Sequence, residues 1–94
     1  MSLRPGVSIG QVDNARVRVT QWRLPPGTET GHHRHEYDYV IVPVIDGVLT
    51  IADSDGTKKF PLQAGQSYFR PKGVEHNVMN VETTQIAFVE VEIK

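Results

Sequence analysis

The stretch Gly31-His32-His33-Arg34-His35 contains three of the four histidines in the chain. Side chains alternate between the two faces of a β-strand, so we expect His33 and His35 to share a face and His32 to point away. Two imidazoles on one face can bind a single metal ion, at roughly 2.0–2.1 Å for zinc, and imidazole also suits iron, nickel and copper. His76 adds a third nitrogen if its strand lies opposite. A solvated, histidine-rich loop without a metal is the alternative.

The rest of the chain consists of short apolar or alternating stretches, separated by turns rich in glycine, proline and aspartate. These stretches predict strands over residues 15–24, 38–45, 48–52, 57–62, 66–70, 76–81 and 86–93. Asp46-Gly47 is typical of a two-residue hairpin turn, and Asp53-Ser54-Asp55-Gly56 predicts a second turn. Because no window has a 3.6-residue apolar period, the pattern predicts an all-β sandwich or barrel of about eight antiparallel strands.

Length and composition fit one small globular domain, residues 1–94, in which residues 1–6 are expected to be a loose N-terminal arm. The chain has 38% apolar and 22% charged residues, a net charge of -1 and no cysteine. This charge gives no general attraction to nucleic acid or to an anionic membrane, and no apolar run approaches the roughly 20 residues of a membrane span. The absence of cysteine excludes disulfides and thiolate ligands, and it fits a cytoplasmic protein.

Two strand patterns bear on the surface of the molecule. Arg16 and Arg18 alternate on one strand and Glu90 and Glu92 on another, so we expect a matching pair of charged faces that is solvated or lies in an interface. Residues 40–45 and 86–93 carry apolar side chains on both faces, which is more than one small interior needs. We therefore expect a homodimer.

Two sets of fixed positions resemble the two motifs of the cupin superfamily. The second motif is matched by Gly65, Pro71, Gly73, His76 and Asn80, and the first by Gly27, His33, His35 and Gly47. The resemblance covers residues 27–80 and implies a small single-domain cupin with a jelly-roll-like fold. The stretch His33-Arg34-His35-Glu36-Tyr37-Asp38-Tyr39 also resembles the small cupins that are named after β-alanine degradation.

One position departs from the cupin pattern. Cupins usually carry a glutamate ligand that three or four residues separate from the second histidine, and at these positions this chain has Tyr39 and Val40. Glu36, Asp38 and Tyr39 are the nearby candidates for a fourth ligand, although the two carboxylates have the wrong parity in a regular strand. The resemblance therefore implies a divalent transition metal, such as iron, nickel, zinc or manganese, on a three-histidine site: His33, His35 and His76.

The absence of a carboxylate ligand has a consequence for function. Three neutral imidazoles leave a divalent ion with a formal charge of +2, which attracts anions and keeps positions open for a ligand. Three-histidine cupins include dioxygenases of thiol acids and diketones, so the resemblance implies a non-haem iron oxygenase of a small organic acid. The alternatives are a Lewis-acid enzyme of the isomerase or decarboxylase type, a small-anion binding module without catalysis, and a metal-free cupin whose histidines only pack.

Three residues near the histidines are candidates for catalysis or substrate binding: Tyr37, Tyr39 and Arg70. Tyr37 shares the parity of His33 and His35, so it is expected to face the same interior. Tyr39 could act as a ligand or an acid, or could only pack. Arg70 could hold a substrate carboxylate through its planar fork of donors, or could instead be exposed or paired with Glu75.

Overall fold

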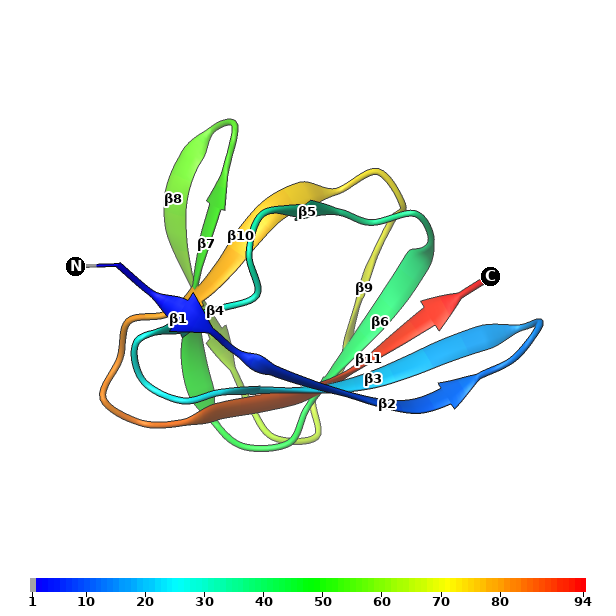
Figure 1. Ribbon diagram of the computed structural model, residues 1–94, viewed down its shortest axis with the longest axis horizontal. Helices are drawn as coiled ribbons and strands as arrows, with labels where there is room; N and C mark the ends of the chain where they lie inside the picture. Colours follow the sequence, from blue (N-terminus) through cyan, green and yellow to red (C-terminus); the bar gives the residue numbers. More distant parts are fainter. Residues whose placement is uncertain (1) are drawn as a thin grey trace.

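The computed structural model describes residues 2–94, which form two facing β-sheets (Figure 1). The first sheet has the order β1 (Arg4–Pro5), β4 (Thr28–Glu29), β10 (Glu75–Asn80), β7 (Gly47–Asp53) and β8 (Gly56–Leu62), and β5 (His33–Arg34) also pairs with β10. The second sheet has the order β2 (Val7–Asp13), β3 (Val17–Leu24), β11 (Ile86–Ile93), β6 (Asp38–Pro43) and β9 (Tyr68–Arg70). The predicted all-β class is confirmed. None of the described residues belongs to a helix that could span a membrane.

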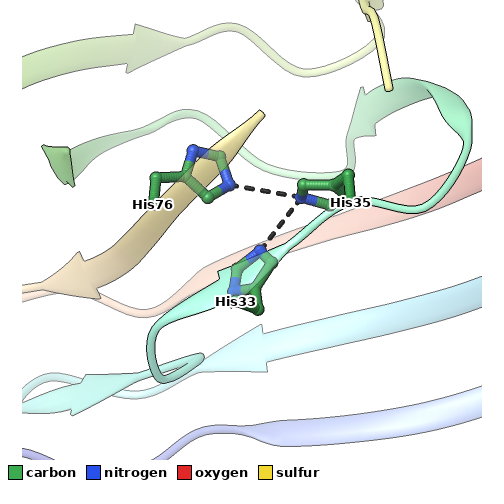
Figure 2. A group of neighbouring side chains, drawn as sticks. All are labelled: His33, His35 and His76. Atoms are coloured by element: carbon green, nitrogen blue, oxygen red, sulfur yellow. Dashed lines mark hydrogen bonds between the residues drawn. The ribbon is translucent and has the colours of Figure 1, made fainter. Parts of the chain in front are cut away.

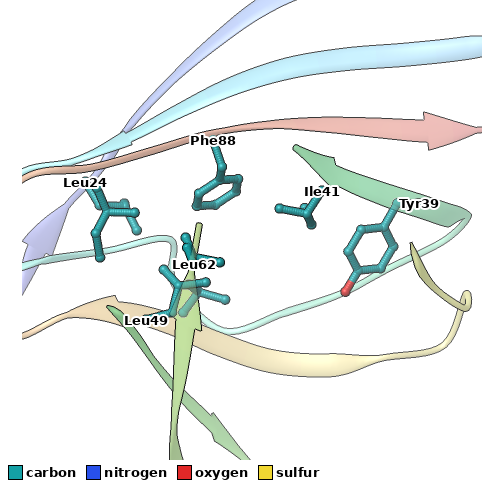
Figure 3. Close-up of a cluster of buried hydrophobic side chains, with 8 residues drawn as sticks. Leu24, Tyr39, Ile41, Leu49, Leu62 and Phe88 are labelled. Atoms are coloured by element: carbon teal, nitrogen blue, oxygen red, sulfur yellow. The ribbon is translucent and has the colours of Figure 1, made fainter. Parts of the chain in front are cut away.

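The core lies between the two sheets and follows from the alternation of side chains along the strands. In β6, Tyr39, Ile41 and Pro43 are buried while the residues between them are only half-buried. Both sheets contribute to one apolar cluster (Figure 3), whose buried members are Leu24, Tyr39, Ile41, Leu49, Leu62, Val78, Ile86 and Phe88. Leu24 and Tyr39 lie at opposite ends of this cluster in Figure 3, and the Tyr39 end is the one that adjoins the histidines.

Asn80 ties the end of β10 to the second sheet. Its side chain is fully buried, and its Nδ2 donates hydrogen bonds to the carbonyl oxygens of Leu24, at 2.7 Å, and Thr84, at 2.8 Å. These bonds satisfy two backbone acceptors where the chain crosses between the sheets. The last motif position therefore has a structural role.

The two predicted turns have different outcomes. Asp53-Ser54-Asp55-Gly56 joins β7 to β8 in an antiparallel pair, with Gly56 at a φ of 116°. Asp46-Gly47 is not a hairpin turn, because β6 and β7 belong to different sheets and this segment crosses between them. A Cβ atom on Gly47 would lie 3.1 Å from Cγ1 of Ile86, so glycine here provides space for a close approach of β7 to the core.

The N-terminal segment is not a loose arm over the part that the structure describes; Met1 lies outside the described residues. Arg4–Pro5 pairs in parallel with Thr28–Glu29, and the N–H groups of Arg4 and Gly6 donate to the carbonyl oxygens of Gly27, at 3.0 Å, and Glu29, at 2.7 Å. A Cβ atom on Gly6 would collide with Cδ2 of Leu24. The segment therefore covers a buried core residue, and the glycine allows it to do so.

Candidate metal centre

Pairing between β5 and β10 brings the histidines of the two motifs together. His33 in β5 lies opposite His76 in β10, and His35 follows β5 directly. The Nε2 atom of His35 lies 2.9 Å from Nε2 of His33 and 3.2 Å from Nε2 of His76 (Figure 2). The three imidazoles that the sequence analysis singled out therefore meet at one point.

The spacing of the three nitrogens fits a single transition-metal ion. Two imidazole nitrogens that each lie about 2.0–2.1 Å from one ion, at an angle of roughly 90–110°, are about 2.9–3.4 Å apart. The observed separations of 2.9 and 3.2 Å fall in this range, and ligand atoms of all three residues lie within 4.8 Å of one another. Over residues 2–94, no aspartate, glutamate or further histidine joins this group.

Hydrogen bonding fixes His33 in the orientation that a metal ligand needs. Its Nδ1 lies 2.7 Å from the carbonyl oxygen of Gly31, so Nδ1–H donates to that oxygen and the lone pair of Nε2 faces the other imidazoles. Gly31 has a φ of 87°, a backbone conformation that glycine adopts without strain. His32 points away, as its parity predicted, and its Nε2 lies 2.8 Å from Oε1 of Glu75 on the surface.

Burial keeps the other two imidazoles neutral. Burial, with a smaller contribution from the nearby His33, lowers the pKa of His35 to about 4. Burial is also the main cause that lowers the pKa of His76 to about 4, with contributions from His33 and His35 that the Asp53 carboxylate partly opposes. Both residues are therefore neutral near pH 7, which is the form that binds a metal ion.

Tyr39 packs on His35 and leaves its own hydroxyl group without a partner. The two rings are stacked, with centroids 3.8 Å apart and an interplanar angle of 16°. The Tyr39 side chain is 2% exposed, yet its hydroxyl forms no hydrogen bond with the described residues. Burial raises the pKa of this phenol above its usual range, so the hydroxyl keeps its proton. Because buried polar groups are nearly always paired, this hydroxyl is a candidate to bind a ligand.

The two nearby carboxylates do not approach the histidines. Oδ1 of Asp38 accepts a hydrogen bond of 2.8 Å from the backbone N–H of Lys72, and Glu36 is exposed. Neither carboxylate belongs to the group of three histidines. Tyr39 contacts this group only through the face of its ring, which stacks on His35. No neighbouring carboxylate therefore takes the place of the usual cupin glutamate ligand.

A cavity of about 530 Å³ opens beside the histidines, between the two sheets. Trp22, Ile51 and Val74 are among its apolar wall residues. Its polar lining, besides the histidines, includes Tyr39, Tyr68, Arg70, Asp53, Lys58 and Glu90. A cavity with apolar walls and a few converging polar groups suits a small organic ligand.

Arg70 is a positioned cation in this lining. Its guanidinium carbon lies 4.8 Å from the ring centroid of Tyr68 and 5.3 Å from that of Phe60, which fixes the long side chain against two aromatic faces. Nη1 donates to the carbonyl oxygen of Phe69 at 3.1 Å, and no carboxylate within residues 2–94 forms an ion pair with Arg70. Glu75, the alternative partner, bonds to His32 instead. The remaining donors of Arg70 are available to an anion.

Tyr37 is not brought to the histidines. The chain bends at Glu36 and Tyr37, so the two-residue alternation of a strand does not continue from His35. The guanidinium carbon of Arg18 lies 5.8 Å from the Tyr37 ring centroid, and Tyr37 is not among the residues that line the cavity.

The charged pair on β3 and β11 joins a partly exposed arginine to a buried carboxylate. Nε and Nη2 of Arg18 each lie 2.8 Å from a carboxylate oxygen of Glu92, which is only 5% exposed. The predicted pairing of these strands is confirmed, and the Arg18 side chain is 42% exposed as expected of a solvated face, but the expectation is wrong for Glu92, which is buried. Leu24 and Trp22 lie on the same face of β3, and they turn it toward the core and the cavity.

The sequence analysis missed Glu90 as a cavity residue, together with Asp53 and Lys58. Burial and, to a smaller extent, the nearby charge of Glu92 raise the pKa of Glu90 to about 7, while Arg18 acts in the opposite direction. The alternation of residues 86–93 places Glu90 on the face of Phe88, which was a signal that this carboxyl points inward.

Comparisons with known proteins agree on one family. A model of the cupin domain matches residues 20–92. Beta-alanine degradation protein BauB of Pseudomonas aeruginosa is 56% identical over 95 aligned residues, with 100% of each chain covered. An oxalate-binding protein of Thermotoga maritima is 32% identical over 69 residues, which are 73% of this chain and 55% of that protein. A crystal structure of a cupin domain from Bordetella pertussis has 50% identity and a TM-score of 0.97, and it covers 100% of this chain and 98% of its own.

Proposed function

The chain belongs to the cupin family, and on this premise we propose that His33, His35 and His76 hold one divalent transition-metal ion that binds a small anionic organic molecule. The convergence of three Nε2 atoms, with separations of 2.9 and 3.2 Å, carries this proposal. The low pKa values of His35 and His76 support it, because neutral imidazoles bind a metal ion without first losing a proton.

When bound, a divalent ion supplies a net positive charge and open positions for an anion, and iron supplies oxygen chemistry in addition. The residues of the chain supply the rest of the site. Arg70 offers a planar fork of donors to a carboxylate, and the Tyr39 hydroxyl offers a neutral hydrogen-bonding group. The apolar walls of the cavity exclude water and strengthen both interactions.

We propose that the reaction is an oxygenation of a small organic acid by a non-haem iron centre. The size of the cavity, about 530 Å³, and its one unpaired arginine support a small acid. The name of the Pseudomonas relative, which refers to β-alanine degradation, supports an acid of that size. A cysteine-free chain fits a reducing cytoplasm, which is where we place this activity.

One observation favours a second candidate function, a small-anion binding module without catalysis. The Thermotoga relative is named as an oxalate-binding protein, and binding of a dicarboxylate needs only the metal ion and Arg70. This candidate differs from the oxygenase in its chemistry but uses the same residues.

The experiment that separates the two candidates is an oxygen-uptake screen on protein reconstituted anaerobically with Fe(II). The oxygenase predicts uptake with at least one member of a panel of thiol acids, amino acids and oxo acids. If the protein is a binding module, addition of an organic acid should release or absorb heat in calorimetry, without oxygen uptake. Arg70→Leu is expected to weaken acid binding by about tenfold or more, because a charged hydrogen-bonding partner is lost. Arg16→Leu, at an exposed position just before β3, is the matched control. Neither uptake nor binding across the panel would contradict both candidates.

A further inference from the structure

Glu90 is a carboxyl group inside the cavity that the metal site and Arg70 do not use. It lies in the middle of β11, at the centre of the second sheet, and its side chain lines the cavity. It has no salt-bridge partner within residues 2–94, since Arg18 pairs with Glu92 through both oxygens. Even a half-buried carboxyl group without a partner is unfavourable, so its place in the cavity favours a ligand group that binds it.

The register of the second sheet separates Glu90 from Arg70. Glu90 lies opposite Ile41 and Ile41 opposite Tyr68, whereas Arg70 lies opposite Tyr39 in the adjoining row. Neighbouring strands are about 4.7–4.9 Å apart, so the backbones of β11 and β9, with β6 between them, are about twice that distance apart. No salt bridge joins Glu90 to Arg70, so they are two separate polar groups of opposite charge that line one cavity.

The buried Tyr39 hydroxyl, on β6 between the strands of Glu90 and Arg70, is also unpaired within residues 2–94. Figure 3 shows this hydroxyl directed into the space between the sheets. An unpaired cation, an unpaired hydroxyl and an unpaired carboxyl thus lie along one wall that faces the histidines.

We propose that the cavity selects a small zwitterion of the amino-acid class, with its carboxylate toward the histidines and Arg70 and its ammonium group bound by Glu90. This inference deepens the proposed function and rests on it, because the metal ion and Arg70 hold the anionic end. The pKa of about 7 gives Glu90 a substantial ionised fraction at neutral pH, and an adjacent ammonium group favours the ionised form.

The test compares ligands that differ only in an ammonium or a methyl group at the far end. The pairs are glycine with propionate, β-alanine with butyrate, and 4-aminobutyrate with pentanoate. Zinc-loaded protein is titrated with each ligand, and binding is followed by calorimetry and by the fluorescence of Trp22, the one tryptophan in the chain, which lines the cavity. Zinc supports no oxygen chemistry, so the readout is binding alone.

At least one ammonium ligand is expected to bind wild-type protein about tenfold or more tightly than its methyl partner, because the bond to Glu90 is between charged groups. Glu90→Gln is expected to reduce this ratio to near 1 with little change for the methyl ligands. Glu82→Gln is the matched control, because Glu82 pairs with Lys59 on the surface, and it is expected to keep the wild-type ratio.

Two failures are distinguishable in this design. Equal affinities within every pair, or a preference that persists in Glu90→Gln, would overturn the role of Glu90 and leave the anion site intact. If no member of any pair binds, oxalate decides between the two claims. Oxalate binding would overturn the zwitterion inference alone, and its absence as well would overturn the anion site of the proposed function.

Discussion

His32 and His33 are neighbours in the chain but have different environments. His33 faces the cavity and meets His35 and His76, whereas His32 bonds to Glu75 on the surface. Alternation along a strand is enough to predict this difference, so the three converging histidines could be found from the sequence. The position of Tyr37 could not, because the chain bends after His35 and the alternation ends there.

Glu90 shows a second limit of prediction from sequence. The alternation in residues 86–93 groups Glu90 with Phe88 and Glu92, but it does not say which face is buried. The charged residues suggested solvent, and the structure turns this face inward because Trp22 and Leu24 on the paired strand β3 lie on it as well. Burial was decided by the apolar residues of a strand far away in the sequence.

The raised pKa of Glu90 predicts a pH dependence of stability. The unfolded chain loses this proton near pH 4.5, whereas the folded protein keeps it up to about pH 7. The free energy of unfolding of metal-free protein should therefore fall as the pH rises through this window, by about 1–3 kcal/mol relative to Glu90→Gln, which cannot ionise. Urea unfolding at pH 4.5 and pH 8 measures the effect, with Glu82→Gln as control. Equal pH dependence in wild type and Glu90→Gln would contradict the burial of this carboxyl.

Strand pairing was the least predictable feature of the fold. The pattern of Asp46-Gly47 is typical of a hairpin, yet β6 pairs with β11 and β9 while β7 pairs with β10 and β8. Local turn chemistry does not decide whether a chain turns back on itself or crosses to another sheet. The β7–β8 hairpin was predictable because its turn and its pairing are both local.

Truncation of the N-terminal segment is expected to lower the free energy of unfolding. Removal of residues 1–6 deletes the pairing of β1 with β4 and uncovers Leu24, which is fully buried. A loss of about 1–3 kcal/mol in the free energy of unfolding is expected from the backbone hydrogen bonds and the apolar area. Removal of residues 1–3 leaves β1 in place and is the control. If both truncations unfold at the same denaturant concentration as the full chain, the segment is not docked in solution.

Both the inner face and the outer face of the second sheet carry apolar side chains. Cross-strand partners point to the same side, so Val91 of β11 lies between Val19 of β3 and Val40 of β6 on the face away from the cavity. Ile9, Phe69 and Ile93 in the same sheet are exposed. A continuous apolar surface of this kind is typical of an interaction site.

We expect a second copy of the chain to cover this outer face. Light scattering should then give twice the chain mass of 10.5 kDa. Val91→Lys should yield monomer, because it places a charge at the centre of the face, while Val81→Lys in the exposed segment after β10 should leave the dimer intact. A monomer for the wild-type protein at micromolar concentration would contradict the homodimer.

The whole arrangement of two sheets serves to hold three imidazoles at one point beside a small cavity. The measurement that tests this most directly is the metal content of untagged protein by elemental mass spectrometry, compared between wild type, His76→Ala and His32→Ala. We expect about one transition-metal ion per chain in wild type and in His32→Ala, whose imidazole lies outside the group, and almost none in His76→Ala. Metal content in His76→Ala equal to that of wild type would contradict the three-histidine site.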